Sequence, residues 1–365
     1  MSVAGSPVAD ARPQLDQLTG LRGLAAWFVV LYHIRFSLTA ILPGEVIAIF
    51  AKGYLAVDLF FMLSGFVMWL SYGEKFRSQG WAQSRPFLWK RFARVWPLHA
   101  LILAGFVMLA LVLAATGRTS DTYPIAELPL HILLIQNWGF TSELAWNPPA
   151  WSISAEFAAY LAFPALIIAI RWERLGLASL VAVIGALALC LHAWFAGLGY
   201  SILDDDIPRT GLVRCLAEFT IGIALAQLWR LMRESGRGGA IPFVVSASTG
   251  ITGIALGLPE TLWVLACFAS LLLALALDGG PATRVLSSTP LVKLGDWSYA
   301  TYLSHYLLFV VFKLAFVGSD LQIGWLGLAA YGAVVLAVSA ALFAGFEKPA
   351  QKWLNQRTPL LLKSA

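Results

Sequence analysis

The residues most suited to chemistry lie in one apolar stretch, LTGLRGLAAWFVVLYHIRF at 18–36, which carries Arg22 and His33. The two are eleven positions apart, which on an α-helix is three turns plus about 20°, so they share a face. At 1.5 Å per residue they are about 16 Å apart along the axis. This geometry favours a long ligand with an anionic head near Arg22 and a reactive tail near His33. An acyl thioester of coenzyme A (CoA) has that shape.

His33 is the candidate general base. Transfer of an acyl group to a hydroxyl needs a base for the hydroxyl proton, an effect of about 10²–10⁴, and imidazole titrates near neutral pH. Ionisable residues inside membrane helices usually mark sites or pathways. The simpler alternative is that Arg22 only extends to the interface and that His33 only bonds a neighbouring helix. Glu156 is expected to orient His33 or to bind the acceptor, and Asp58 is an alternative for either role. Pairing of such a carboxylate with Arg35 or Arg214 would merely neutralise buried charge.

Arg91 and Arg94 are three positions apart at the start of another apolar run, so one helical turn points both in the same direction. Guanidinium groups bind phosphate through two parallel hydrogen bonds. With Arg22 they are expected to hold the nucleotide end of CoA. The alternative is that they only fix the orientation of the helix in the membrane.

Three further residues are candidates for binding the acceptor. Tyr302 and His305 lie on nearly one helix face, as a binding pair or as a packed polar patch. Trp151 suits stacking on a sugar ring, although tryptophan is equally common at membrane interfaces. Arg214 and Glu218, four apart, predict a structural ion pair. No pattern of residues predicts a metal site, and the three cysteines form no disulfide or zinc pattern.

The composition indicates the elements that position these residues. The chain is 59% hydrophobic and 12% charged, about half the charged share of soluble domains. About 20 apolar residues cross a bilayer as a helix. We therefore predict an all-α polytopic membrane protein with about ten transmembrane helices, at 22–42, 53–72, 96–116, 150–170, 176–196, 210–230, 241–257, 260–277, 296–317 and 323–346. The run 125–137 is too short to span and predicts a re-entrant or interfacial segment.

The charge distribution predicts the orientation. With ten spans and the N-terminus inside, the cytoplasmic segments hold 19 of the 25 Lys and Arg residues, a strong positive-inside bias. This bias accounts for the basic pI without nucleic acid as a partner. The predicted organisation is a cytoplasmic tail at 1–20, one transmembrane domain at 21–346 and a cytoplasmic tail at 347–365. The first apolar run carries no cleavage site, so we expect it to be retained.

Seven segments together resemble the acyltransferase family 3 membrane enzymes. An Arg and a His separated by ten residues in the first span are typical of that family. The other six follow in family order: GYLAVDLFFMLSGFVM (53–68), KRFARVWPLH (90–99), NPPAWSISAEFAAY (147–160), RCLAEFTIGIALA (214–226), DWSYATYLSHYLL (296–308) and FEKPAQKWL (346–354). The likeness spans about residues 15–355. It departs from the family at Phe157, where a second acidic residue is common.

The resemblance implies an enzyme of the inner membrane that transfers an acyl group, usually acetyl, from cytoplasmic acyl-CoA. The implied acceptors are hydroxyls of cell-surface glycans or lipid-linked saccharides. Direct transfer and a relay through an acylated residue both fit the sequence, and a homodimer is neither required nor excluded. The alternative from another class is a transporter that uses intramembrane His, Arg and Glu as a proton or substrate path.

Overall fold

The computed structural model describes residues 15–118, 120–277, 280–318 and 321–357, and all regular elements in these ranges are helices. The long α-helices are α1 (Asp16–Ile34), α3 (Ala56–Gln79), α4 (Ser84–Ala115), α6 (Trp151–Ala169), α7 (Leu177–Gly197), α8 (Ile207–Glu234), α9 (Ala240–Ala255), α10 (Glu260–Ala276), α12 (Thr289–Phe316) and α13 (Trp325–Leu342). The short ones are α2 (Gly44–Phe50), α5 (Leu128–Leu133), α11 (Pro281–Leu286) and α14 (Lys348–Gln356). Single helical turns complete them: η1 (Arg35–Leu38), η2 (Gly53–Leu55), η3 (Gly80–Gln83), η4 (Ile125–Glu127), η5 (Pro148–Ala150), η6 (Trp172–Arg174) and η7 (Phe343–Glu347).

The helices form a membrane-type bundle. In the described ranges, seven helical stretches are long and apolar enough to cross a bilayer, and one of these, Gly44–Ala115, contains both α3 and α4. Helices α9 and α10 are apolar but shorter. An all-α protein with several membrane-spanning helices is thereby confirmed, and the number ten stays a prediction. The predicted non-spanning run 125–137 contains only η4 and the six residues of α5.

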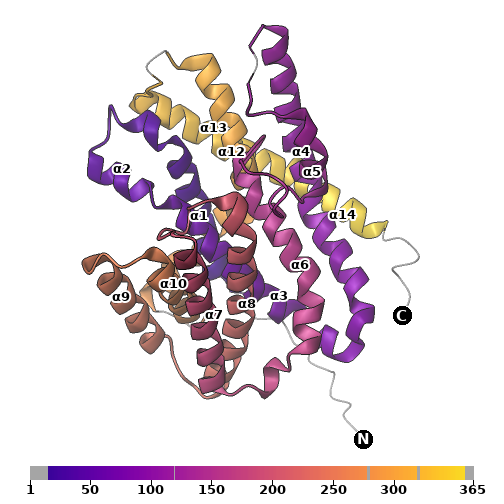
Figure 1. Ribbon diagram of the computed structural model, residues 1–365, viewed down its shortest axis with the longest axis vertical. Coiled ribbons are helices and arrows are strands. Elements are labelled where there is room, and N and C mark those ends of the chain that lie inside the picture. Colours follow the sequence, from indigo (N-terminus) through magenta and orange to yellow (C-terminus); the bar gives the residue numbers. More distant parts are fainter. Residues whose placement is uncertain (1–14, 119, 278–279, 319–320, 358–365) are drawn as a thin grey trace, which may run out of the picture.

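Two helix pairs set the positions of the candidate residues. Helix α1 packs along α12, and α3 packs along α8, so segments almost 300 positions apart lie side by side (Figure 1). Glycines allow both contacts. A Cβ atom on Gly295 would lie 1.9 Å from the carbonyl oxygen of Thr19, and one on Gly222 would lie 2.0 Å from that of Met62. The backbones therefore touch where a side chain would hold them apart.

Helix α1 differs from the predicted first span at both ends. It begins at Asp16, before the predicted start at residue 22, and ends at Ile34, where a 3₁₀ turn follows. An acidic residue in the first turn suits the positive end of the helix dipole. At the other end, Arg35 Nη1 donates a 2.5 Å hydrogen bond to the Tyr32 carbonyl and so satisfies a terminal acceptor. His33 consequently lies in the last turn of α1 and not near the middle of the span.

Both predicted tails contain helical residues. Helix α1 includes the last residues of the predicted tail 1–20, and α14 forms within the predicted tail 347–365. The rest of both predicted tails, 1–14 and 358–365, lies outside the described residues. The side of the membrane on which each tail lies stays a prediction.

Gly295→Ala should destabilise the protein, because its methyl group would collide with the α1 backbone rather than with a flexible side chain. Overpacking of this kind costs about 1–3 kcal/mol. Gly332→Ala is the matched control, since no atom lies within 4 Å of its added Cβ. Thermal unfolding of the detergent-solubilised variants, followed by loss of the monodisperse gel-filtration peak, measures the difference. Equal melting temperatures for the two variants would show that α1 and α12 are not in backbone contact.

Candidate active site

A cavity of about 200 Å³ lies between five long helices of the bundle. It follows α3 from Val57 to Met68, about 16 Å at 1.5 Å per residue. Its polar lining combines basic and acidic groups with hydroxyls: Arg22, Ser64, Arg91, Arg94, Ser152, Glu156, Tyr160, Ser298, Tyr299 and Tyr302. We call it the inner cavity. It contains five of the predicted site residues, namely the three arginines, Glu156 and Tyr302.

The three arginines differ in how fully they are bonded. Arg22 Nε donates to Ser298 Oγ at 3.0 Å and its Nη2 to the Gly295 carbonyl at 2.9 Å. Arg94 forms an ion pair with the buried Glu347. Arg91 donates to the Tyr72 hydroxyl at 3.3 Å, while its buried Nε has no acceptor in the described part of the chain. A buried charged donor without an acceptor is costly, so Arg91 is the guanidinium most ready to bind an anionic or carbonyl group.

Glu156 accepts a 2.7 Å hydrogen bond from the hydroxyl of Tyr160, one turn along α6. That hydroxyl also lies 3.4 Å from Ser64 Oγ. The carboxylate therefore belongs to the inner cavity, and its hydrogen-bond partner is Tyr160 rather than His33.

Aromatic side chains close one end of the inner cavity. The Tyr302 hydroxyl lies 2.7 Å from Ser152 Oγ and 3.0 Å from the Pro149 carbonyl. Its ring meets Phe60 edge to face, with centroids 5.9 Å apart. His305, one turn farther along α12, lies behind it with centroids 6.1 Å apart. Tyr302 therefore separates the inner cavity from His305.

His33 and His305 form a hydrogen-bonded pair between α1 and α12. His305 Nε2 lies 3.2 Å from His33 Nδ1. His33 Nδ1 is also 3.0 Å from the Val29 carbonyl, and His305 Nδ1 is 3.1 Å from the Thr301 carbonyl. Arg22 and His33 thus both contact α12, as their shared helix face predicts.

When both rings are neutral, the carbonyl acceptors determine which ring nitrogens of this pair carry a hydrogen. A carbonyl oxygen only accepts, so each Nδ1 carries a hydrogen. His305 Nε2 is then unprotonated and accepts from His33 Nδ1. The remaining lone pair falls on His33 Nε2, which has no hydrogen-bond partner among the described residues. His305 is fully buried, whereas His33 is half-buried. The pair therefore presents one basic nitrogen, held in a fixed tautomer.

Asp58 lies in a separate buried cluster. Both of its carboxylate oxygens accept from Arg214, at 2.7 and 2.6 Å, and all of these atoms are buried. Glu218 lies 3.7 Å from the same guanidinium. This is the charge-neutralising arrangement offered above as the alternative for Asp58, and it includes the predicted pair of Arg214 and Glu218.

Trp151 packs inside the bundle. Its ring meets Phe61 edge to face at 5.8 Å, the guanidinium of Arg214 lies over it at 5.5 Å, and it is 6% exposed. These are packing contacts next to the Asp58 cluster, and the role of Trp151 in binding the acceptor stays a prediction.

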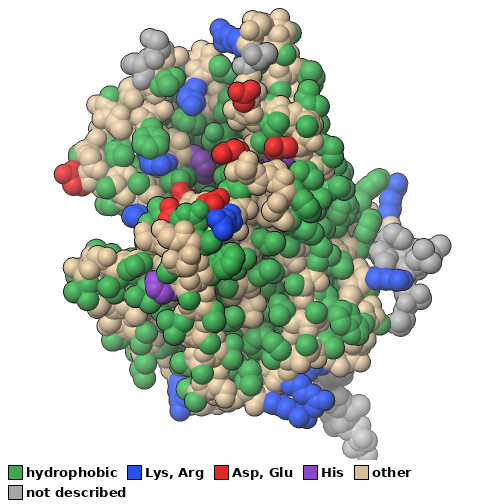
Figure 2. All heavy atoms as spheres, in the orientation of Figure 1, with side chains coloured by type: hydrophobic (Ala, Val, Ile, Leu, Met, Phe, Trp, Pro, Cys, Tyr) green, Lys and Arg blue, Asp and Glu red, His purple; other side chains and the backbone are tan. Residues whose placement is uncertain are grey.

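The surface beside His33 is polar. Tyr32 donates a 2.7 Å hydrogen bond to Asp204, in the loop between α7 and α8. Burial raises the pKa of Asp204 above its usual value, and the bond from Tyr32 opposes that rise. Figure 2 shows charged side chains across the middle of the visible face, around a hollow in which histidine atoms are visible. Tyr32 and Asp204 were not among the predicted site residues, because nothing in the sequence links two segments so far apart.

A larger cavity of about 770 Å³ adjoins the inner one at the end of the bundle where α1 begins and α3 and α8 end. We call it the mouth. Arg22, Leu63 and Val67 line both cavities. Together the two have a volume typical of ligand sites, about 300–1,000 Å³. In the described chain no group of three or more His, Cys, Asp or Glu residues is placed to hold a metal ion.

Comparison with known proteins finds relatives over most of the chain. A family model described as "Acyltransferase domain" matches residues 15–344. The chain is 31% identical to "Acyltransferase MdmB" of Streptomyces mycarofaciens, over 95% of this chain and 94% of that protein. It is 25% identical to "Peptidoglycan O-acetyltransferase OatA" of Listeria monocytogenes, over 81% of this chain and 49% of that protein. No solved structure matches significantly.

Proposed function

This chain belongs to the acyltransferase family whose model covers residues 15–344, and from that premise we propose which groups it transfers and how. The prediction of an acyltransferase is confirmed over that of a transporter. We propose that the donor is an acyl-CoA, in the first place acetyl-CoA. We propose that the acceptor is a hydroxyl of a cell-surface glycan or of a lipid-linked saccharide, as the name of the Listeria relative suggests.

The paired cavities support the acyl-CoA donor. Phosphate groups need cations, and Arg22, Arg91 and Arg94 are gathered on one cavity although they come from two helices. The narrow inner part runs along α3 toward Tyr302, which suits a thin pantetheine arm with its thioester at the far end. The wide mouth would admit the nucleotide. The mouth opens on the side of the membrane that we predict to be cytoplasmic.

The free nitrogen of His33 is the single observation that carries the mechanism. The acceptor hydroxyl would approach from the polar surface beside His33. As its oxygen attacks the thioester carbonyl, the hydroxyl proton passes to His33 Nε2. The carbon–sulfur bond then breaks, and the departing CoA thiolate takes up the proton. His305 holds the ring in the required tautomer through the bond at 3.2 Å.

Tyr302 must move for this direct transfer, because it separates the inner cavity from the histidine pair. Rotation of its side chain away from Ser152 would join the two spaces. Tyr302 and His305 would then act at the reaction centre, Glu156 would line the donor path, and Asp58 would support the fold. Transfer through an acylated residue is the competing route. We expect the protein to work in the inner membrane with both termini cytoplasmic.

Acetyl-CoA should raise the melting temperature of the detergent-solubilised protein, because a ligand of the folded state stabilises it by about 2.7 kcal/mol at 100 times its Kd. Acetyl phosphate, which lacks the nucleotide and pantetheine, is the control donor and should have no effect. A protein stabilised by neither compound would contradict an acyl-CoA donor.

Arg91→Ala sharpens this measurement. Loss of a charged donor lowers acetyl-CoA affinity by about 10-fold or more, so the melting shift at a fixed ligand concentration should shrink. Lys90→Ala is the matched control, since Lys90 is exposed on the same helix and does not line the cavity. Equal shifts in the two variants would assign Arg91 a role in membrane orientation only.

A further inference from the structure

The side chains that line the mouth carry more positive charges than negative ones. Five basic side chains line it, Arg22, Lys75, Arg77, Arg230 and Arg233, against two acidic ones, Glu74 and Glu234. Trp69 and Trp229 lie among them. A cavity with several cations and aromatic rings matches an adenine nucleotide, whose phosphates need charge and whose base needs a flat apolar surface.

Three of these cations have no acidic partner. In the part of the chain that the structure describes, no ion pair within 4.0 Å involves Arg22, Lys75 or Arg233. Arg22 is instead hydrogen-bonded to Ser298 and to the Gly295 carbonyl. Lys75 lies 5.6 Å from the ring of Tyr72, and Arg233 lies 5.2 Å from that of Trp229. One is on α3 and the other on α8, so they face the mouth from different helices.

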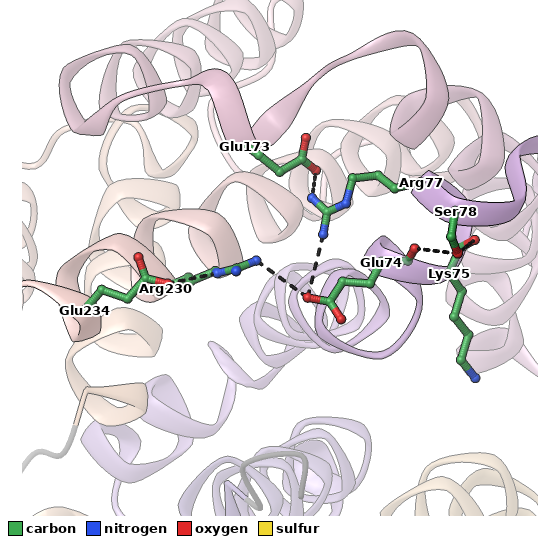
Figure 3. A network of polar contacts seen from close by, with 7 residues as sticks. All are labelled: Glu74, Lys75, Arg77, Ser78, Glu173, Arg230 and Glu234. Atoms are coloured by element: carbon green, nitrogen blue, oxygen red, sulfur yellow. Dashed lines mark hydrogen bonds and ion pairs between the residues drawn. The ribbon is translucent and has the colours of Figure 1, made fainter. Parts of the chain in front are cut away.

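Arg77 and Arg230 share one exposed carboxylate. Glu74 lies 3.9 Å from Arg77 and 3.8 Å from Arg230, between α3 and α8 (Figure 3). Glu74 is 78% exposed, and exposed pairs at such distances contribute little to stability. Each guanidinium has a closer acidic partner, Glu173 for Arg77 and Glu234, at 3.1 Å, for Arg230. Glu74 is therefore a weak counter-ion that a phosphate can displace.

We propose that the mouth is the subsite for the 3′-phosphate and adenine nucleotide of CoA, with Lys75 and Arg233 supplying the unpaired charge and Glu74 acting as a displaceable counter-ion. The inner arginines would then contact the diphosphate and the pantetheine arm. This assignment rests on the proposed acyl-CoA donor. It makes Lys75 and Arg233 ligand-binding residues.

The test compares CoA with dephospho-CoA, which differs only in lacking the 3′-phosphate. Binding of each to the full-length purified protein is measured by isothermal titration in lipid-free detergent. Wild-type protein should prefer CoA by about 10-fold, the effect of one or two charge-assisted bonds. In the double variant Lys75→Ala, Arg233→Ala the ratio should approach one, while dephospho-CoA binds nearly as before.

Two further variants make the test independent of folding defects. Glu74→Gln should raise CoA affinity by about two- to five-fold, because it removes a negative charge that lies within 4 Å of two guanidinium groups. Arg85→Ala is the control: it removes an exposed positive charge that does not line the mouth, and it should leave the ratio unchanged.

The outcomes separate the two proposals. Wild-type protein that binds CoA and dephospho-CoA equally overturns the mouth as nucleotide subsite but leaves the acyl-CoA donor standing. A preference for CoA that survives the double variant has the same meaning. Wild-type protein that binds neither compound overturns both proposals. A ratio that falls equally in Arg85→Ala assigns the effect to overall charge and also overturns the subsite.

Discussion

His33→Ala should abolish acyl transfer while leaving acyl-CoA binding intact. The variant loses the only free basic nitrogen of the histidine pair, and general base catalysis contributes about 10²–10⁴ to the rate. The donor cavities should be unaffected, because His33 lines neither of them. The rate is measured as O-acetyl content of surface glycans in cells that depend on the variant. Binding is measured as the melting shift with acetyl-CoA.

Two other histidine variants serve as controls for this result. His192→Ala removes a half-buried histidine on α7 that bonds Thr261, and it should retain full transfer. His305→Ala keeps the base and its bond to the Val29 carbonyl but loses the second acceptor that orients the ring, so the rate should fall less than in His33→Ala. Full transfer by His33→Ala would exclude it as the base and would favour another group in the inner cavity.

Asp58→Ala should strongly destabilise the protein. It leaves Arg214 fully buried with its bidentate partner gone, and breaking a buried ion pair costs about 3–5 kcal/mol. Glu218 stays 3.7 Å from the guanidinium but forms no hydrogen bond to it, so it compensates only in part. The measurement is thermal unfolding and the yield of folded protein. We expect little folded Asp58→Ala protein at 37 °C.

Replacing the whole charged cluster separates a structural role from a catalytic one. Asp58→Leu with Arg214→Met and Glu218→Met removes the three buried charged side chains together, and such exchanges are often neutral or stabilising. The triple variant should therefore recover folded protein and acyl transfer. Recovery of folding without transfer would assign Asp58 to the reaction and contradict the structural role.

The sequence predicted the helical bundle well because apolar runs of about 20 residues have few alternatives in a membrane. It predicted the ends of α1 poorly. Hydropathy extends the run to residue 42, whereas a 3₁₀ turn begins at Arg35. The interruption depends on the bond from Arg35 to the Tyr32 carbonyl, which hydropathy does not register.

The sequence also predicted which residues share a face but not which residues meet across helices. The spacing of Arg22 and His33 gave a common face, and both contact α12. That His305 rather than a carboxylate is the partner of His33 depends on how α1 and α12 align. This alignment is set by close contacts such as that of Gly295 with Thr19, which join positions far apart in the chain. For the same reason the sequence offered the pairing of Asp58 with Arg214 only as an alternative, beside a pairing with Arg35.

The most direct measurement is an experimental structure of the protein with acetyl-CoA bound. The account predicts the nucleotide in the mouth between α3 and α8, the pantetheine arm beside Arg22 and Arg91, and the acetyl carbonyl at Tyr302. It also predicts that the Tyr302 side chain has moved toward opening a path to His33. Acetyl-CoA bound outside both cavities, or a thioester that ends away from Tyr302, would contradict it.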